Sequence, residues 1–123
     1  MENGKAVVCF ICRDGFLGSP MQMHAFSDYL TRNQIRDVVS ISAGLQTIES
    51  ELNYKETIRK VDILVSLLEP SGGIEFLLKT LGLREDASLF YLSDIYKEHR
   101  RSEKAVFRYL ARQARQKSCL ECA

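Results

Sequence analysis

The sequence contains no apolar run near the roughly 20 residues that a membrane-spanning helix needs. It also contains no internal repeat and no low-complexity segment, and its polar start precedes a strand-like segment too short for a signal peptide. The two histidines, His24 and His99, do not have the spacing of metal ligands. These absences favour a cytoplasmic protein without a membrane span, and we expect neither a metal nor another cofactor.

The composition fits one globular domain. The chain has 123 residues, of which 46% are hydrophobic and 27% are charged, as in soluble globular proteins. Its net charge is +1, but the residues from Lys97 onward carry eight basic and three acidic side chains, so the rest of the chain is acidic. We expect a single domain over residues 1–117 and a cysteine-containing C-terminal tail over residues 118–123.

Four cysteines form two Cys-x-x-Cys pairs, Cys9 with Cys12 and Cys119 with Cys122. Such pairs could suggest a zinc site. Cys9 lies inside an apparent strand, however, where alternation directs its side chain away from the loop that follows. We therefore expect Cys9 to be a small core residue rather than a zinc ligand.

Strand and helix patterns alternate along the whole chain. Strands are predicted at Lys5–Ile11, Asp37–Ser42, Val61–Leu68 and Ser88–Leu92, and helices at Pro20–Arg32, Ile74–Leu81 and Ser102–Gln116, with a weaker helical pattern over Gln46–Lys60. Strands that alternate with helices form parallel sheets with right-handed crossovers. The expected fold class is α/β, a three-layer α/β/α arrangement around a four-stranded parallel sheet.

A candidate anion site follows the first predicted strand. Cys12 opens a short loop that contains Gly15 and Gly18, and Ser19 and Pro20 then suit the N-cap and the first position of a helix. Backbone N–H groups and the positive end of the helix dipole favour an anion at such a place. A cysteine at its mouth should favour the thiolate form and act as a nucleophile.

The last predicted helix has a basic stripe on one face and an apolar stripe on another. The basic residues recur at spacings of three and four; they are Arg101, Lys104, Arg108, Arg112 and Arg115. The simplest interpretation is an amphipathic helix docked on the sheet with a solvated outer face. The alternative is a surface for an acidic partner, nucleic acid or anionic lipid, of which nucleic acid is not the partner we expect.

Residues 12–20, CRDGFLGSP, resemble the phosphate loop of the low-molecular-weight protein tyrosine phosphatases, and of the arsenate reductases related to them, which have Cys-x5-Arg-Ser-Pro. Cys12 matches the nucleophile of that family, and Ser19 and Pro20 match the two residues after its arginine. Gly18 stands where the arginine should be.

Two later strands also resemble the family. Residues 39–44, VSISAG, look like its second strand, and residues 61–65, VDILV, look like its third. Asp94-Ile95-Tyr96 lies at a place comparable to the family's Asp-Pro-Tyr motif, although Ile95 replaces the proline. The resemblance implies a low-molecular-weight phosphatase-like fold.

The chemistry that the resemblance implies is phosphomonoester hydrolysis through a cysteinyl-phosphate. Cys12 would attack phosphorus as a thiolate, and Asp94 would protonate the leaving group. The Ser19 hydroxyl would bond the thiolate and help it to leave in the second step. The phosphate oxygens would be held by the loop from Arg13 to Ser19, namely Arg13, Asp14, Gly15, Phe16, Leu17, Gly18 and Ser19.

The missing arginine decides how much of this chemistry is expected. Its guanidinium would bind two phosphate oxygens as a planar fork. By analogy with arginine fingers, its loss costs roughly 10³- to 10⁵-fold in rate. Arg13 could replace it only by turning into the loop, whereas a side chain at that position tends to point outward. Weak or absent phosphatase activity is therefore predicted.

Three interpretations remain open at this point. In the first, the chain is an enzyme with reduced or redirected activity, on a phosphoprotein or another phosphomonoester. In the second, it is a pseudophosphatase that binds phosphate or another small oxyanion, or whose loop only supports the fold. In the third, it is an arsenate reductase-like redox protein in which Cys119 or Cys122 resolves a disulfide with Cys12. The oligomeric state is not predicted.

Overall fold

The centre of the molecule is a four-stranded sheet, seen in a computed structural model that describes residues 4–13, 18–44 and 52–122 (backbone only at 52–55 and 118–122). Its strands are β1 (Ala6–Cys12), β2 (Val38–Gly44), β3 (Ile63–Ser66) and β4 (Ser88–Tyr91). Their order is β2-β1-β3-β4, and every neighbouring pair is parallel. The predicted four-stranded parallel sheet is confirmed.

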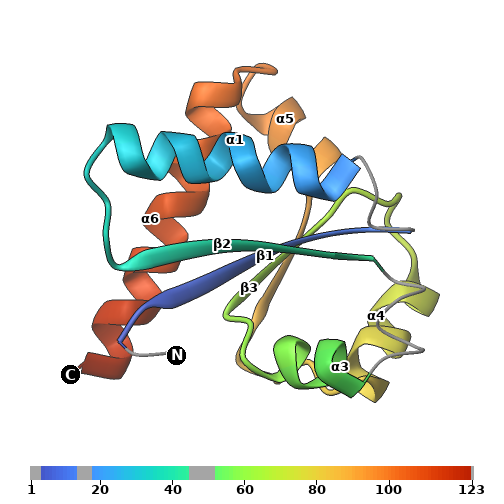
Figure 1. Cartoon of the computed structure of the whole chain (residues 1–123). Coiled ribbons are helices and arrows are strands. Elements are labelled where there is room, and N and C mark those ends of the chain that lie inside the picture. Colours follow the sequence, from blue (N-terminus) through green and yellow to red (C-terminus); the bar gives the residue numbers. More distant parts are fainter. Residues whose placement is uncertain (1–3, 14–17, 45–51, 123) are drawn as a thin grey trace.

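Helices cover both faces of this sheet (Figure 1). One layer contains α1 (Gly18–Arg32), α5 (Leu92–Glu98) and α6 (Glu103–Cys122), and the other contains α3 (Leu52–Arg59) and α4 (Gly72–Thr80). The alternation of β1 explains the two layers, because successive side chains of a strand point to opposite faces. Ala6, Val8 and Phe10 belong to the first core, whereas Val7, Cys9 and Ile11 belong to the second.

An aromatic cluster fills the first core. The Phe26 ring of α1 lies 5.7 Å from the Phe10 ring and 5.3 Å from the Phe107 ring, measured between centroids. All three side chains are buried. Burying such rings is worth several kcal/mol in total, at about 1.5–3 kcal/mol for each large apolar side chain, so this contact fixes α1 and α6 on the sheet.

The second core is smaller and aliphatic. Ile58 of α3 and Leu78 of α4 are fully buried against Cys9 and Leu64 of the sheet. Cys9 is therefore a core residue, as predicted from the alternation of the first strand.

Local signals explain how α4 begins and ends. The Ser71 hydroxyl accepts a hydrogen bond from the Gly73 N–H, so Ser71 is the N-cap. Gly82 has φ +110° just after the helix, a conformation that suits glycine. The helix begins two residues before the predicted Ile74, and the predicted stop at Gly82 is confirmed.

The start of α1 differs from the prediction. We expected Ser19 as N-cap and Pro20 as the first helical residue, whereas the helix begins at Gly18. Ser19 is fully buried, and its hydroxyl bonds to the Ala43 carbonyl and to Cys12 instead of capping its own helix. Tertiary contacts with the sheet thus override the local capping preference.

Other boundaries also shift. Ala43 and Gly44 lie within β2, since both pair with β1, and β3 is shorter than the predicted Val61–Leu68. The helix α5 was not predicted, because it follows β4 directly and has only seven residues. The weak helical pattern corresponds to α3, and its first part, residues 46–51, lies outside the described residues.

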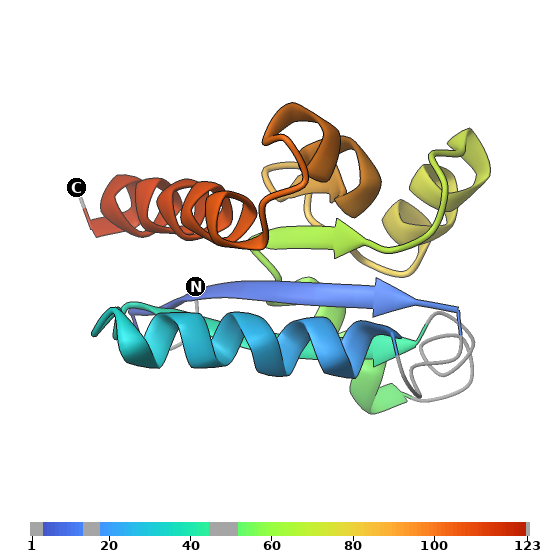
Figure 2. The same cartoon turned by 90° about the horizontal axis from the view of Figure 1, so that it is seen from above.

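The last helix runs past the predicted Gln116 to Cys122, so its backbone includes most of the expected tail. Arg115 pairs with Asp37, just before β2, and Lys117 bonds the Asp86 carbonyl, just before β4. The C-terminal half of α6 therefore lies at the edge of the sheet where the strands begin. Figure 2 shows this end of α6 far from the arrowhead of β1. No helix of the described residues could span a membrane.

Candidate functional site

The carboxyl ends of all four strands meet at one edge of the sheet. Cys12 is the last residue of β1 and lies in register with Gly44 of β2, and Ser66 lies in register with Ile11 and with Tyr91 of β4. The chain runs from β1 to β2 on one side and then returns to β3 on the other. Parallel sheets bind ligands beyond the carboxyl ends of strands at such a reversal, which here lies between β1 and β3.

Cys12 and Ser19 form the chemical centre of this edge. The Cys12 Sγ lies 3.0 Å from the Ser19 Oγ, although seven residues separate them. Ser19 is fully buried, and Cys12 is 8% exposed. Cys12 ends a strand and Ser19 is in the first turn of α1, and these two elements place two of the three predicted catalytic residues in direct contact.

The proton on the Ser19 hydroxyl can serve either of two acceptors. The hydroxyl donates to the Ala43 carbonyl at 3.2 Å, which leaves an oxygen lone pair for the S–H of Cys12. If Cys12 is a thiolate, the hydroxyl can turn and donate to sulfur instead. Ser19 can therefore serve both protonation states of the cysteine.

A leucine fills the space beside Gly18. A side chain at Gly18 would place its Cβ 3.1 Å from the Leu67 Cδ2 and 3.9 Å from the Cys12 Cβ. The first distance is tighter than an ordinary carbon–carbon contact. The place from which an arginine would extend is thus occupied on one side by an apolar side chain.

Two hydrogen-bonded contacts position Leu67. The Leu67 N–H donates to the Ile11 carbonyl at 2.9 Å, which extends the β1–β3 ladder beyond Ser66. The buried Ser66 hydroxyl then accepts from the Leu68 N–H at 3.1 Å, which turns the chain. Leu67 was not predicted as a site residue, and its place next to Gly18 depends on strand order.

The other predicted phosphate ligands divide into two groups. Arg13 is exposed, consistent with the expectation that its side chain points out of the loop. Asp14, Gly15, Phe16 and Leu17 lie outside the described residues. The described part of the predicted phosphate loop is therefore Cys12, Arg13, Gly18 and Ser19.

Asp94 lies on the same edge of the sheet but at a different strand. It is exposed in the first turn of α5, which follows β4 directly. Because β4 is two strands from β1 and neighbouring strands are about 4.8 Å apart, about 10 Å separates the two strand ends. Asp94 is thus exposed to solvent at the same edge as Cys12, and it follows a strand two places away in the sheet.

Tyr91 is a further polar residue at this edge that was not predicted. Its hydroxyl donates to the Glu75 Oε1 of α4 at 3.4 Å. Partial burial raises the pKa of Tyr91, with Glu75 and Asp94 adding to the rise and a backbone hydrogen bond at Ser71 opposing it. Tyr91 therefore remains a neutral hydrogen-bond donor at physiological pH.

The other cysteines are separate from Cys12. Burial raises the pKa of the Cys9 thiol to about 12, on the opposite face of the sheet. The backbone of α6 at Cys119 lies just beyond Lys117, which contacts the loop before β4. Among the described side chains, no three His, Cys, Asp or Glu residues gather as a metal site would require.

Comparison with known proteins supports the fold. No family model matches the sequence, and no curated protein matches it. Among solved structures, the chain is similar to "Crystal structure of Primo-1", with a TM-score of 0.54 and 17% sequence identity over 89% of this chain and 91% of that chain. At this level of identity the similarity shows an α/β fold with a parallel sheet between helical layers, and nothing of the chemistry.

Proposed function

We propose that the chain is a divergent low-molecular-weight phosphatase-like protein that binds a phosphate-type oxyanion beside Cys12, with turnover that is weak or absent. The observation that supports this proposal is the 3.0 Å contact between the Cys12 Sγ and the Ser19 Oγ where α1 begins. The first N–H groups of a helix have no intrahelical partner, and the helix dipole favours negative charge at this end.

The reaction would proceed in two steps. The Cys12 thiolate attacks phosphorus, so an S–P bond forms while the P–O bond to the leaving group breaks. A general acid, for which Asp94 is the candidate, gives a proton to the leaving oxygen. Water then attacks phosphorus and gives a proton to the carboxylate of Asp94, while the S–P bond breaks and a hydrogen bond from Ser19 stabilises the departing thiolate.

The absence of arginine at position 18 is the reason to expect slow turnover. A glycine offers only its backbone N–H, and the loss of a guanidinium in phosphoryl transfer costs roughly 10³- to 10⁵-fold in rate. Leu67 beside Gly18 adds apolar surface where a charged fork would be needed.

The same observation favours a second candidate, an oxyanion-binding module without catalysis. Such a module needs the N–H groups of the first turn and the Ser19 hydroxyl, but neither a nucleophile nor Asp94. Binding that survives Cys12→Ser would distinguish the module from the enzyme.

The described arrangement disfavours a disulfide between Cys12 and Cys119 or Cys122. A disulfide requires Cα atoms within about 7 Å. The end of α6 is held near the starts of β2 and β4, whereas Cys12 is at the end of β1. A seven-residue strand is about 20 Å long, so the helix end would have to unfold to reach Cys12.

The test combines hydrolysis of para-nitrophenyl phosphate with calorimetric binding of inorganic phosphate. Wild type is compared with Cys12→Ser, Ser19→Ala and the double variant Gly18→Arg/Leu67→Ala, in which the second change makes room for the new side chain. Leu67→Ala alone is the matched control.

The outcomes distinguish an enzyme from a binding module. Slow hydrolysis by wild type that is lost in Cys12→Ser, with a phosphorylated Cys12 detected by mass spectrometry, supports the enzyme. Phosphate binding without hydrolysis in wild type, with activity gained in the double variant, supports the binding module on a phosphatase scaffold. If phosphate does not bind to any variant and none is active, the proposed function is wrong.

A further inference from the structure

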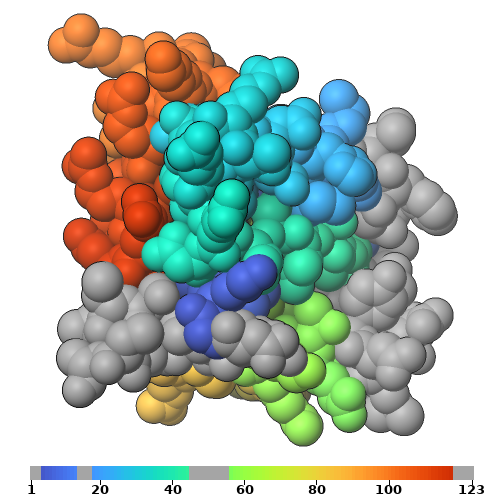
Figure 3. Space-filling model, turned by 60° about the vertical axis from the view of Figure 1, so that its left-hand side comes forward, coloured from blue at the N-terminus to red at the C-terminus, as the bar shows by residue number. Residues whose placement is uncertain are grey.

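A groove with a volume of about 740 Å³ lies between α1 and α6. Figure 3 shows the two helices adjoining on one face of the molecule, α1 in cyan and α6 in orange to red. The Asp37–Arg115 ion pair places the groove at the edge where the strands begin. Cys12, by contrast, lies at the opposite end of β1.

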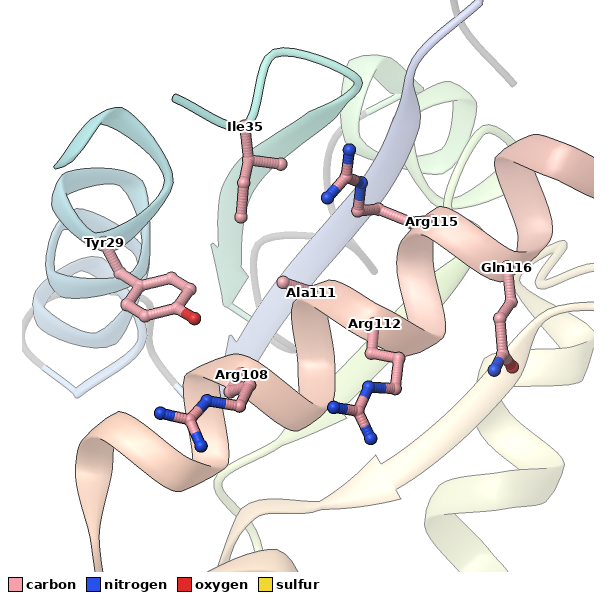
Figure 4. Close-up of a pocket in the computed structure, with 7 residues that line it drawn as sticks. All are labelled: Tyr29, Ile35, Arg108, Ala111, Arg112, Arg115 and Gln116. Carbon is pink, nitrogen blue, oxygen red and sulfur yellow. The ribbon is translucent and has the colours of Figure 1, made fainter. Parts of the chain in front are cut away.

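The floor of the groove is apolar and preformed. It consists of Tyr29 of α1, Ile35 before β2 and Ala111 of α6, whose side chains converge in Figure 4. The Tyr29 ring stacks on Phe26 with centroids 6.4 Å apart and lies 5.9 Å from the Phe107 ring. The tyrosine is thus fixed by the aromatic core, and a ligand would not have to order it.

One wall of the groove is a row of arginines. Arg108, Arg112 and Arg115 follow each other along α6 at positions i, i+4 and i+7, which spans about 10 Å. Arg115 is bound to Asp37 through Nε, at 3.2 Å from Oδ2. Arg108 and Arg112 are exposed, and within the described part of the chain neither forms an ion pair or hydrogen bond.

Two further arginines lie near the groove in the sequence. Arg32 ends α1, and Arg36 follows Ile35; both are exposed next to residues of the groove, although neither lines it. A row of arginines along one side of an apolar floor is complementary to a ligand with an apolar ridge beside acidic side chains.

We propose that this groove docks an acidic amphipathic helix of a partner protein. Apolar side chains of that helix would cover Tyr29, Ile35 and Ala111, as amphipathic helices do in apolar grooves. Carboxylates at i, i+4 and i+7 of the partner have the same pitch as Arg108, Arg112 and Arg115, so each can pair with a guanidinium. The basic stripe of α6 then serves recognition as well as solvation.

The shape of the groove favours a helix over a membrane or nucleic acid. A bilayer surface cannot reach a recessed floor, and Met21 and Phe76, the large apolar side chains that protrude from the described part of the chain, do not line the groove. A nucleic-acid duplex would leave the apolar floor uncovered, because its outer surface offers phosphate and sugar rather than aliphatic side chains.

The test uses a display library of helical peptides of five turns, about 18 residues. Binders are selected on wild-type protein after counter-selection on Arg108→Glu/Arg112→Glu, whose altered side chains are exposed. Selected peptides are then titrated against wild type, this variant and the control Lys79→Glu/Lys97→Glu, which has the same charge change outside the groove. Circular dichroism verifies that all three proteins are folded.

We expect enriched peptides with an apolar stripe flanked by acidic residues, and binding to wild type and control with Kd of about 1–10 µM. Charge reversal at Arg108 and Arg112 should weaken it at least about 10-fold, and added salt should weaken it as well. A loss of this binding would leave phosphate binding at Cys12 unchanged, so the two proposals can fail separately.

The proposal is overturned if no peptide is enriched, or if the enriched peptides lack acidic residues. Tighter binding of random-sequence RNA or of phosphatidylserine vesicles through the same two arginines would also overturn it. So would a dimer of this chain, seen by sedimentation, that disappears in the Arg108→Glu/Arg112→Glu variant.

Discussion

Replacing Asp62 by Asn should lower the free energy of unfolding by about 3 kcal/mol. The Asp62 side chain is only 1% exposed. Asp62 directly precedes β3, and its side chain contacts β1, so it joins the two strands that lead to Cys12 and Leu67. Its Oδ2 accepts from the Val7 N–H at 2.8 Å, and its Oδ1 lies 2.6 Å from the Arg84 Nη2.

The magnitude follows from what the substitution leaves behind. Removing one partner of a buried ion pair costs about 3–5 kcal/mol, since the other charge is stranded. The Arg84 side chain is 31% exposed, and it would keep the Val61 carbonyl at 3.1 Å and the Asp86 carboxylate at 3.7 Å. Water and these two partners would compensate part of its charge, which favours the lower end of that range. An asparagine oxygen could still accept from Val7, but its amide group would then face the guanidinium, donor against donor.

The loss should be visible as a lower melting temperature. With an unfolding entropy of about 2.1 cal/mol/K per residue, a chain of this length has about 0.26 kcal/mol/K in total. A loss of about 3 kcal/mol therefore lowers Tm by about 12 °C. Urea unfolding and calorimetry would measure the two quantities independently.

The control is Asp86→Asn, which removes an exposed carboxylate 3.7 Å from the same Arg84. Because Asp86 is 70% exposed, its loss should change stability by less than about 0.5 kcal/mol. Arg84→Met and the double variant Asp62→Asn/Arg84→Met complete a double-mutant cycle, with an expected coupling of about 2 kcal/mol. Additive effects, or a loss below about 1 kcal/mol for Asp62→Asn, would refute the reasoning.

Three further predictions concern the fold. Because burial raises the pKa of Cys9 from 9.0 to about 12, the unfolded chain loses this thiol proton first. The contribution of Cys9 to the free energy of unfolding is therefore intact below pH 9, and it falls by about 1.4 kcal/mol per pH unit as the pH rises toward 12. Cys9→Ala should abolish this part of the pH dependence in urea titrations at pH 8 and 10.5. An unchanged pH dependence would contradict the prediction. Gly82→Ala should lower the free energy of unfolding by about 1–2 kcal/mol in the same assay, because φ is +110° and the new Cβ would lie 3.1 Å from the Arg59 Cγ. An unchanged stability would be inconsistent with this geometry. Ser71→Ala should cost about 1 kcal/mol by removing the cap of α4, whereas Ser71→Asp should preserve stability, and equal losses in both would exclude capping as the cause.

Much of the fold follows from local patterns in the sequence. Apolar strand segments alternating with amphipathic segments predict a parallel sheet between helices, because parallel strands need long crossovers. The spacing of Cys12, Gly18 and Ser19 after a strand is enough to predict that a cysteine and a helix start share the carboxyl edge of the sheet. The period of α6 likewise separates its buried and basic faces.

The tertiary structure determines contacts between residues that are far apart in the sequence, which a local sequence pattern does not contain. The order β2-β1-β3-β4 places Leu67 beside Gly18, and the ladder to β2 gives the Ser19 hydroxyl the Ala43 carbonyl instead of a capping role. Both contacts join residues more than 20 positions apart, so they depend on which strands pair rather than on local preference. The groove between α1 and α6 exists for the same reason, because two amphipathic helices reveal their shared surface only once both are packed on the same face of one sheet.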